Sequence, residues 1–327
     1  MSEFTTPFST PTVFVCSATG SQGSALCHEL RKLNWRVRAT TRNPSSASAQ
    51  ALTAIGVELT KGDWEDEEAL REGLTGCTKL FICLMPDFNH WTAEHEQTTR
   101  ICALARQAGT VDHVVASSSL GGFWLDEGGR PPIRPGPMFA NILKSKYSIE
   151  RATRAAGFRR CTVVRPGFFM ANFYEPHMSQ LGYSEIRDAG VWRSAWRPET
   201  RIALIDHVDV ARIAAAALQH PDAFDGRTIA AVSERVPVQE ALDQLAAAVG
   251  GGKTLKAEFI SDEELLDKFM AGVEPLPYNK EPCWRYMSDF PDHPEELKDV
   301  MPRMTTFREF LEREKDALAA TWGSPSA

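Results

Sequence analysis

Short apolar runs alternate with stretches of helical spacing along the first half of the chain. Such runs are typical of buried strands, and apolar residues recurring every three or four positions indicate helices that cover them. Strands are predicted from residue 12 and at 35–44, 56–64, 79–86, 111–119 and 161–172. Helices are predicted from residues 25 and 65 and at 95–108 and 138–156. Strands that alternate with helices form right-handed βαβ units, so we predict an α/β fold built on a parallel sheet.

The second half of the chain has a less regular pattern. Residues 174–200 are predicted to be irregular and are rich in Trp, Tyr, Arg and His. Helices are predicted at 209–220 and 238–249, and strands at 227–232 and 255–260. Two capping boxes, Ser261-x-x-Glu264 and Thr306-x-x-Glu309, predict two further helix starts.

The first predicted strand leads into a turn with the spacing Ser17-x-x-Gly20-x-x-Gly23 and then into a helix. In this context the backbone N–H groups at the helix start face an anion, and the helix dipole favours negative charge there. Gly20 would let the chain approach a pyrophosphate, and Gly23 would let the helix pack closely on the strand. Serine at a positive φ would cost about 1 kcal/mol or more, so we expect this turn to differ from its glycine version. The alternative is a strand–turn–helix without a ligand.

The end of the second predicted strand indicates which dinucleotide would bind. An NAD site needs a carboxylate about 20 residues after the glycines. No Asp or Glu lies between Leu30 and Leu52, and Arg42 stands in that place, flanked by Thr41 and Asn43. A cation there suits the 2′-phosphate of NADP. The alternative is an ordinary exposed arginine.

Asp63 follows the third predicted strand and has two possible roles. It could accept a hydrogen bond from the adenine amino group, or it could stabilise a turn or cap the next helix.

Composition narrows the class of protein. The chain has 327 residues, 43% of them hydrophobic, and a net charge of −7 without a basic stripe, so direct nucleic-acid binding is not expected. No apolar run reaches about 18 residues, so no membrane span is expected, and the first residues do not resemble a signal peptide. The seven cysteines are scattered without CxxC spacing, which favours reduced thiols and a cytoplasmic protein over disulfides or a metal site.

Five motifs in order resemble the NmrA-like branch of the atypical short-chain dehydrogenases. They are the Ser17–Gly23 turn, Thr41-Arg42-Asn43-Pro44, Lys146-x-x-x-Glu150, Arg165-Pro166-Gly167 with Phe169-Met170-Ala171-Asn172, and the segment 205–211. The resemblance covers residues 12–320. It implies a doubly wound Rossmann domain that binds NAD(P), with a smaller α+β lobe over the substrate cleft. The family includes NADPH-dependent reductases and also redox sensors that bind the dinucleotide without turnover.

On this basis we divide the chain into three parts. Residues 1–11 are expected to be a flexible N-terminus. Residues 12–167 and 205–235 would form the NAD(P)-binding domain, and residues 168–204 and 236–327 the smaller lobe.

A reductase must place a proton as well as bind its hydride donor. Ordinary short-chain dehydrogenases use Tyr-x-x-x-Lys, but Ile142 stands four residues before Lys146. Related reductases are thought to use the lysine itself, which makes Lys146 the candidate proton donor, because desolvation in an apolar cleft turns a lysine ammonium into a usable acid at neutral pH. Lys146 could instead only bind the nicotinamide ribose. Ser119 could hold a substrate oxygen. Lower-ranked alternatives to the lysine are Tyr147, Tyr174, His90 and His177.

The resemblance also implies contacts to the cofactor and substrate. The expected cofactor residues are Ser17, Thr19, Gly20, Gln22, Gly23, Arg42, Asn43, Asp63, Leu84, Met85, Lys146, Pro166, Gly167 and Phe168. The expected substrate residues are Phe169, Phe173, Tyr174 and Trp192, in a closed apolar pocket. The same aromatic residues could equally form a core between the lobes.

The sequence therefore predicts an NADPH-dependent reductase of a small, apolar or aromatic ketone, enone, quinone or imine, with a role in secondary metabolism. The alternative is an NADP(H)-sensing regulator that acts through a protein partner. No Ser-His-Asp elbow or metal-ligand spacing supports a hydrolase or a metalloenzyme.

Overall fold

The computed structural model describes residues 10–130, 137–270, 281–286, 290 and 295–323. The predicted flexible N-terminus therefore lies almost entirely outside the described residues. The chain forms two compact units. Unit 1 contains residues 1–117, 149–163 and 214–227, and unit 2 contains residues 118–148, 164–213 and 228–327. The predicted three-part division of the chain stays a prediction.

Unit 1 is built from alternating strands and helices, as the apolar pattern predicts. Its elements are β1 (Thr12–Val15), α1 (Ser21–Lys32), β2 (Arg36–Thr41), α2 (Ala47–Ala54), β3 (Val57–Lys61), α3 (Glu67–Leu74), β4 (Lys79–Ile82), α4 (Ala93–Ala108), β5 (His113–Ser117) and α9 (Pro221–Phe224). Three elements have residues in both units: α5 (Pro137–Ala155), β6 (Arg160–Pro166) and α8 (His207–Gln219). The first turn of α3 contains Glu67 and Glu68, with Asp66 as its N-cap, and α4 ends at Gly109 with φ +75°.

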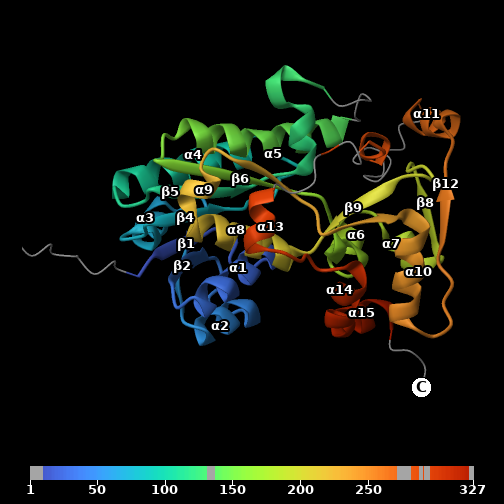
Figure 1. The fold of residues 1–327 in the computed structure, drawn as a ribbon, viewed down its shortest axis with the longest axis horizontal. Helices are drawn as coiled ribbons and strands as arrows, with labels where there is room; N and C mark the ends of the chain where they lie inside the picture. Colours follow the sequence, from blue (N-terminus) through green and yellow to red (C-terminus); the bar gives the residue numbers. More distant parts are fainter. Residues whose placement is uncertain (1–9, 131–136, 271–280, 287–289, 291–294, 324–327) are drawn as a thin grey trace, which may run out of the picture. The chain divides into compact units, whose positions relative to one another are not determined.

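The central sheet has seven strands in the order β10-β6-β5-β4-β1-β2-β3, with β10 formed by Thr228–Ala231. The strands β5, β4, β1, β2 and β3 pair in parallel. In unit 1, α1 and α2 lie on one face of the strands and α3 and α4 on the other (Figure 1). This is the predicted doubly wound Rossmann arrangement. The strand order reverses between β1 and β4, where open α/β sheets bind their ligands.

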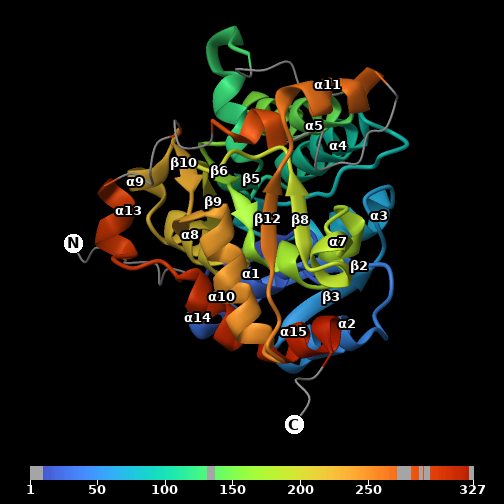
Figure 2. The ribbon, with the colours of Figure 1, turned by 90° about the vertical axis from the view of Figure 1, so that its right-hand side faces the viewer.

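Unit 2 contains two further sheets. A three-stranded sheet has the order β11-β9-β7, and a parallel pair joins β12 to β8, side by side in Figure 2. Its other elements include three 3₁₀ helices. The unit 2 elements are η1 (Leu120–Trp124), η2 (Asp126–Gly128), β7 (Phe168–Phe169), η3 (Met170–Phe173), α6 (His177–Gln180), α7 (Ser184–Asp188), β8 (Val191–Ser194), β9 (Arg201–Ile205), β11 (Glu234–Pro237), α10 (Val238–Val249), β12 (Lys256–Phe259), α11 (Asp262–Met270), α13 (Glu295–Val300), α14 (Phe307–Arg313) and α15 (Lys315–Trp322).

The prediction that residues 174–200 are irregular is wrong. The segment forms α6, α7 and β8. The two helices have only four and five residues, which is too short to produce a periodic apolar pattern. Of the two predicted capping boxes, the one at Thr306 is complete, and at Ser261 the side chain accepts from the Glu264 N–H at 3.0 Å.

Aromatic side chains form the core of unit 2. Phe168 lies 5.9 Å from Phe173 and 6.1 Å from Trp192, measured between ring centroids. Trp196 is 0% exposed and lies 6.3 Å from Phe168. Burying such rings in contact with one another is a large part of the stabilisation of this unit.

Candidate dinucleotide site

The turn between β1 and α1 contains the serine and the two glycines of the predicted motif. Ser17 has φ +51°, which is the positive φ that the sequence analysis expected to cost a serine energy. The Ser17 hydroxyl donates to the carbonyl oxygen of Cys83, just beyond β4, at 2.6 Å. A left-handed serine costs about 1–2 kcal/mol, and a hydrogen bond of this kind offsets about 1 kcal/mol of that cost. The signal that sequence reasoning missed is a contact between residues 66 positions apart.

The two glycines of the turn have different roles. A Cβ on Gly23 would lie 2.2 Å from the Ser17 carbonyl oxygen and 2.8 Å from the Ala18 Cα, so α1 packs directly on the backbone of the turn. A Cβ on Gly20 would lie 3.3 Å from its nearest neighbour, and Gly20 has φ −89°. Only Gly23 is required by the packing of the turn. The close approach of α1 is to the turn that follows β1 rather than to the strand itself.

The start of α1 is open to an anion. The helix begins at Ser21 without a side-chain cap and without an acidic residue in its first turn. Thr19 and Gly20 are exposed. Gln22 has a structural contact, because its Oε1 accepts from the Ser117 hydroxyl of β5 at 2.7 Å. The residues fit a pyrophosphate, since a glycine backbone and uncapped N–H groups are what such a group binds.

The ends of β2 and β3 carry the residues expected at the adenosine end. Arg42 is exposed, and its side chain has no hydrogen bond or ion pair within the described part of the chain. The Asn43 Oδ1 accepts from the Ser45 N–H at 3.0 Å, which holds the turn before α2. Asp63 Oδ1 accepts from the N–H groups of Glu65 and Asp66 at 2.8 and 3.2 Å. Of the two roles expected for Asp63, the structure shows the turn role.

The loop after β4 contains two predicted cofactor residues with opposite exposure. Leu84 is 1% exposed and belongs to a core cluster of unit 1, whereas Met85 is 70% exposed. Only the backbone of Leu84 could contact a ligand. Met85 could do so with its side chain.

Lys146 lies on α5 and is half-buried. Its carbonyl oxygen accepts from the Ser118 hydroxyl at 3.3 Å, and Ser118 N–H donates to Val164 at 2.9 Å. Ser119 is half-buried and precedes η1, and its carbonyl oxygen accepts from the Gly122 N–H at 2.9 Å. Ile142 packs against the aromatic core of unit 2. The position that holds the tyrosine in ordinary short-chain dehydrogenases is therefore occupied here by an apolar residue that packs against the core.

An ion pair that sequence reasoning missed stands beside this helix. Arg165 is 1% exposed and makes two bonds to Asp126, at 2.6 and 2.7 Å. The guanidinium lies 4.4 Å from the Phe123 ring centroid. The Tyr147 hydroxyl donates to Asp126 at 3.3 Å. This contact makes Tyr147 a weaker candidate for a proton donor, because its proton is already directed at a carboxylate.

The first residue after β6, Gly167, is packed tightly against the backbone of β9. A Cβ on Gly167 would lie 2.3 Å from the Ala203 carbonyl oxygen, and Gly167 N–H donates to Ala231 at 3.0 Å. The glycine is therefore explained by the close approach of backbone to β9. Pro166 lies at the end of β6 and Phe168 is 6% exposed.

The predicted substrate residues lie mostly in the core. Phe173 is 1%, Trp192 2% and Tyr174 9% exposed, and Phe169 is half-buried. Burial raises the pKa of the Tyr174 phenol, which makes it a poorer proton donor near neutral pH. Burial lowers the pKa of His177, which leaves less of its imidazole protonated there. His90 lies in a loop of unit 1, where its Nε2 is 2.9 Å from the Thr92 hydroxyl. Two roles were open for the aromatic residues, a substrate pocket and a core. Phe173 and Trp192 lie in the core of unit 2.

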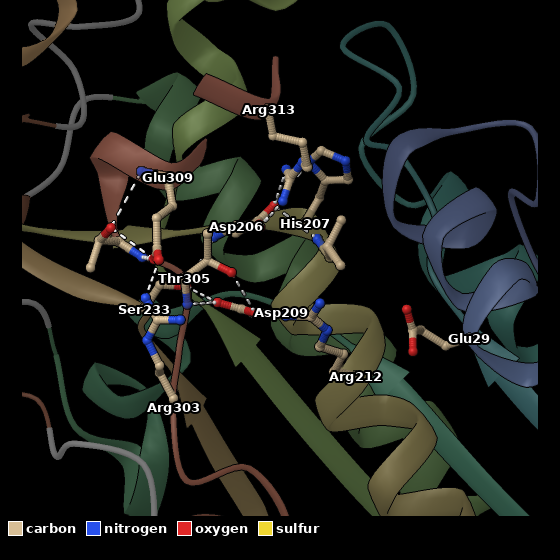
Figure 3. Close-up of polar contacts among 12 residues, drawn as sticks. Glu29, Asp206, His207, Asp209, Arg212, Ser233, Arg303, Thr305, Glu309 and Arg313 are labelled. Carbon is tan, nitrogen blue, oxygen red and sulfur yellow. Dashed lines mark hydrogen bonds and ion pairs between the residues drawn. The ribbon is translucent and has the colours of Figure 1, made fainter. Parts of the chain in front are cut away.

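The motif at 205–211 binds the C-terminal part of unit 2. Asp206 is 0% exposed and pairs with Arg313 of α14 at 2.6 and 2.9 Å (Figure 3). Asp209 accepts from the Thr305 N–H and hydroxyl at 2.7 and 3.0 Å and from the Ser233 hydroxyl at 2.7 Å. Burial is the largest influence on the pKa of Asp206 and raises it, but the bonds and charge of Arg313, the Val208 N–H and the charge of His207 together leave that pKa below its usual value. This motif is structural.

Two kinds of site can be assessed over the described ranges. Within them, no group of three or more His, Cys, Asp or Glu side chains could hold a metal ion. Nor does any helix there have the length and apolar character needed to cross a bilayer.

The sheet order, its switch point and the flanking helices define an α/β protein with a doubly wound Rossmann fold. A family model described as the NmrA-like family matches residues 9–311, and the chain belongs to that family. The resemblance inferred from the five motifs is confirmed.

Curated relatives agree with this membership, and solved structures share the fold. The NmrA-like family domain-containing oxidoreductase himF of Aspergillus japonicus is 27% identical over 193 residues, 57% of this chain and 56% of that protein. The corresponding protein cpsB of Aspergillus campestris is 25% identical over 254 residues, 73% of each chain. The structure of NmrA, a negative transcriptional regulator, in complex with NADP has a TM-score of 0.68 at 18% identity, covering 96% of this chain and 99% of that chain. An NADPH-dependent quinone oxidoreductase from Escherichia coli has a TM-score of 0.66 at 20% identity, covering 92% and 98%. At these identities the solved structures show the fold alone.

Proposed function

We propose that this chain is an NADP(H)-dependent reductase of a small, apolar organic acceptor such as a ketone, enone, quinone or imine. The observation that carries the proposal is the β1–α1 turn, where Gly23 leaves no room for a Cβ and the helix start is uncapped. Relatives named oxidoreductases, such as himF and cpsB, support an enzyme of this class. Solved structures of the same fold include proteins with NADP.

The residues of unit 1 would bind the dinucleotide. The turn at Ser17–Gly23 would hold the pyrophosphate, and exposed Arg42 would pair with the 2′-phosphate. NADPH supplies a hydride, with its two electrons, to the acceptor when bound. The protein must then supply one proton to complete the reduction.

Residues of unit 2 would place that proton. Lys146 Nζ is the proposed donor, and the Ser118 contact to its backbone at 3.3 Å fixes the helix turn that carries it. Ser119 would hold the acceptor oxygen. Because the proton leaves an ammonium group, Lys146 would return to its charged state by taking a proton from water before the next cycle.

A sensor is the second candidate. Its support is Ile142, whose packing in the core removes the hydroxyl acid of ordinary short-chain dehydrogenases. A sensor must bind oxidised and reduced cofactors with different free energies in two conformations. It would act through a protein partner and would not oxidise NADPH in the presence of any acceptor.

Cofactor preference tests the nucleotide part of the proposal. Titration should show that NADPH binds roughly ten- to hundredfold more tightly than NADH, because Arg42 can form a charge-assisted contact with the extra phosphate. Arg42→Ala should remove the preference while leaving NADH affinity unchanged. Equal affinities in the unmutated protein would contradict the assignment of Arg42.

Turnover tests the role of Lys146. With a quinone that the protein reduces, Lys146→Met should lower kcat by about a hundredfold or more and change NADPH affinity far less. A loss that is confined to NADPH affinity would assign Lys146 to the ribose. If no ketone, enone, quinone or imine in a broad panel causes NADPH oxidation, and NADP⁺ and NADPH bind with different affinities, the sensor is the better reading.

A further inference from the structure

The loop between β4 and α4 exposes apolar side chains at the carboxyl ends of the strands, where a ligand is expected. Met85 is 70% and Phe88 49% exposed. In the described part of unit 1, one further large hydrophobic side chain is exposed. It is Leu33, at the end of α1. Exposed hydrophobic side chains are usually scattered singly over a protein surface, whereas Met85 and Phe88 lie within four residues of each other.

This loop adjoins the candidate dinucleotide turn. The Ser17 hydroxyl donates to Cys83 at 2.6 Å, so the first residue after β4 is tied to the turn after β1. The strand order reverses between β1 and β4, and the loop therefore flanks the crevice at the switch point. Arg42 and Asp63 follow β2 and β3, on the other side of that point. The loop thus lies on the side opposite the adenosine end.

Hydrogen bonds hold the loop in shape. Asp87 accepts from the Asn89 N–H at 2.8 Å and from the His90 N–H at 3.1 Å. The Phe88 ring lies perpendicular to the Trp91 ring, with 5.6 Å between centroids. A fixed aromatic ring that keeps half of its surface exposed is suited to contact a second ring.

We propose that Met85 and Phe88 bind the apolar body of the acceptor and select acceptors with extended aromatic surfaces. The inference rests on the proposed reductase function and names the residues that set its specificity. The aromatic residues first expected to do this, Phe173 and Trp192, are almost fully buried against one another. The contact is one of hydrophobic packing only, and the chemistry of reduction is unchanged.

The experiment compares acceptors of one and three rings. Steady-state NADPH oxidation is measured with 1,4-benzoquinone and 9,10-phenanthrenequinone for the wild type, Phe88→Ala and Phe88→Tyr. Phe88→Ala should raise KM for the three-ring quinone about tenfold or more, raise KM for benzoquinone less than about threefold, and leave kcat and NADPH affinity unchanged. Phe88→Tyr, which retains the ring, should behave as the wild type. Leu33→Ala removes an exposed apolar side chain of the same unit and should change none of these values.

Several results would overturn the inference. Equal changes in KM for the two quinones, or none, would show that Phe88 does not contact the acceptor. Weaker NADPH binding in Phe88→Ala would assign the loop to the cofactor. A wild-type dimer that becomes a monomer in Phe88→Ala, by analytical ultracentrifugation, would assign it to a second copy of the chain.

A separate measurement keeps the inference distinct from the proposed function. If the wild type reduces neither quinone, calorimetric titration of 9,10-phenanthrenequinone into the NADP⁺ complex still tests the loop. Binding that is lost in Phe88→Ala and kept in Leu33→Ala would support the aromatic site while the reductase proposal fails. Absent binding, or equal binding in all variants, would overturn the site as well.

Discussion

Acidification should destabilise the protein through His113, a 0% exposed histidine of β5. The Thr162 hydroxyl donates to the Phe224 carbonyl at 2.9 Å, and His113 Nε2 lies 3.2 Å from the same hydroxyl oxygen. Nε2 must therefore carry the ring hydrogen and donate to Thr162. Nδ1 is buried, and no hydrogen-bond partner for it exists among the described residues. Protonation would leave a buried N–H unpaired.

The magnitude follows from the pKa of this ring. Burial, with the charges of Lys79 and Arg160 next, lowers the pKa of His113 from 6.5 to about 4, against a weaker opposing effect of Asp225 and Asp222. The unfolded chain then binds more protons than the folded one between these two values, so stability rises with pH. The contribution is complete above pH 6.5 and is lost as the pH falls toward 4. At about 1.36 kcal/mol per pKa unit, it amounts to about 3 kcal/mol.

The assay is urea unfolding of the wild type and His113→Gln at pH values from 7.5 to 4. Glutamine can donate to Thr162 in place of Nε2 but does not titrate. Between pH 7.5 and 4 the wild type should lose about 3 kcal/mol more free energy of unfolding than the variant does. His220→Gln, at an exposed histidine of unit 1, controls for the substitution itself. Parallel pH profiles for the wild type and His113→Gln would refute the reasoning.

Two further predictions concern the turn and the motif at 205–211. Gly23→Ala should cost about 1–3 kcal/mol in thermal unfolding and abolish NADPH binding in calorimetry, because its Cβ would lie 2.2 Å from a backbone oxygen. Gly20→Ala is the matched control. It should stay within about 1 kcal/mol of the wild type, because Gly20 already has a φ that alanine adopts. Similar losses of stability in the two variants would contradict the role of the close contact at Gly23. Asp206→Asn should lower the free energy of urea unfolding by about 2–3 kcal/mol, less than a fully buried pair would lose because the Arg313 side chain is 37% exposed. An unchanged urea midpoint would show that the pair contributes nothing to stability.

The sequence predicts those parts of the fold that rest on local pattern. The β1–turn–α1 unit and the Thr306 capping box are confirmed, because each depends on residues within a few positions of one another. The pair Asp206–Arg313 joins residues 107 positions apart. No local pattern could pair them. The same holds for Arg165 and Asp126, which are 39 positions apart.

Part of the candidate site was predicted by residue type alone, which cannot tell a ligand contact from packing. Gln22 was expected to contact the cofactor, and Asp63 either to do so or to stabilise a turn; in the structure their side chains bind Ser117 and the turn before α3. Phe173 and Trp192 were expected in a pocket and lie in the core. Exposure in the folded chain decides between these roles, and exposure depends on which segments pack together.

The two departures from the short-chain dehydrogenase pattern bear differently on the choice between reductase and sensor. Ser17 in place of glycine is compensated within unit 1, since its own hydroxyl stabilises the positive φ through Cys83, and so it does not argue against cofactor binding. Ile142 in place of tyrosine is not compensated by the adjacent phenol, because Tyr147 donates to Asp126. The burden of proton transfer therefore falls on Lys146. A sensor would need no such group, which makes the kcat of Lys146→Met, rather than its cofactor affinity, the quantity that separates the two functions.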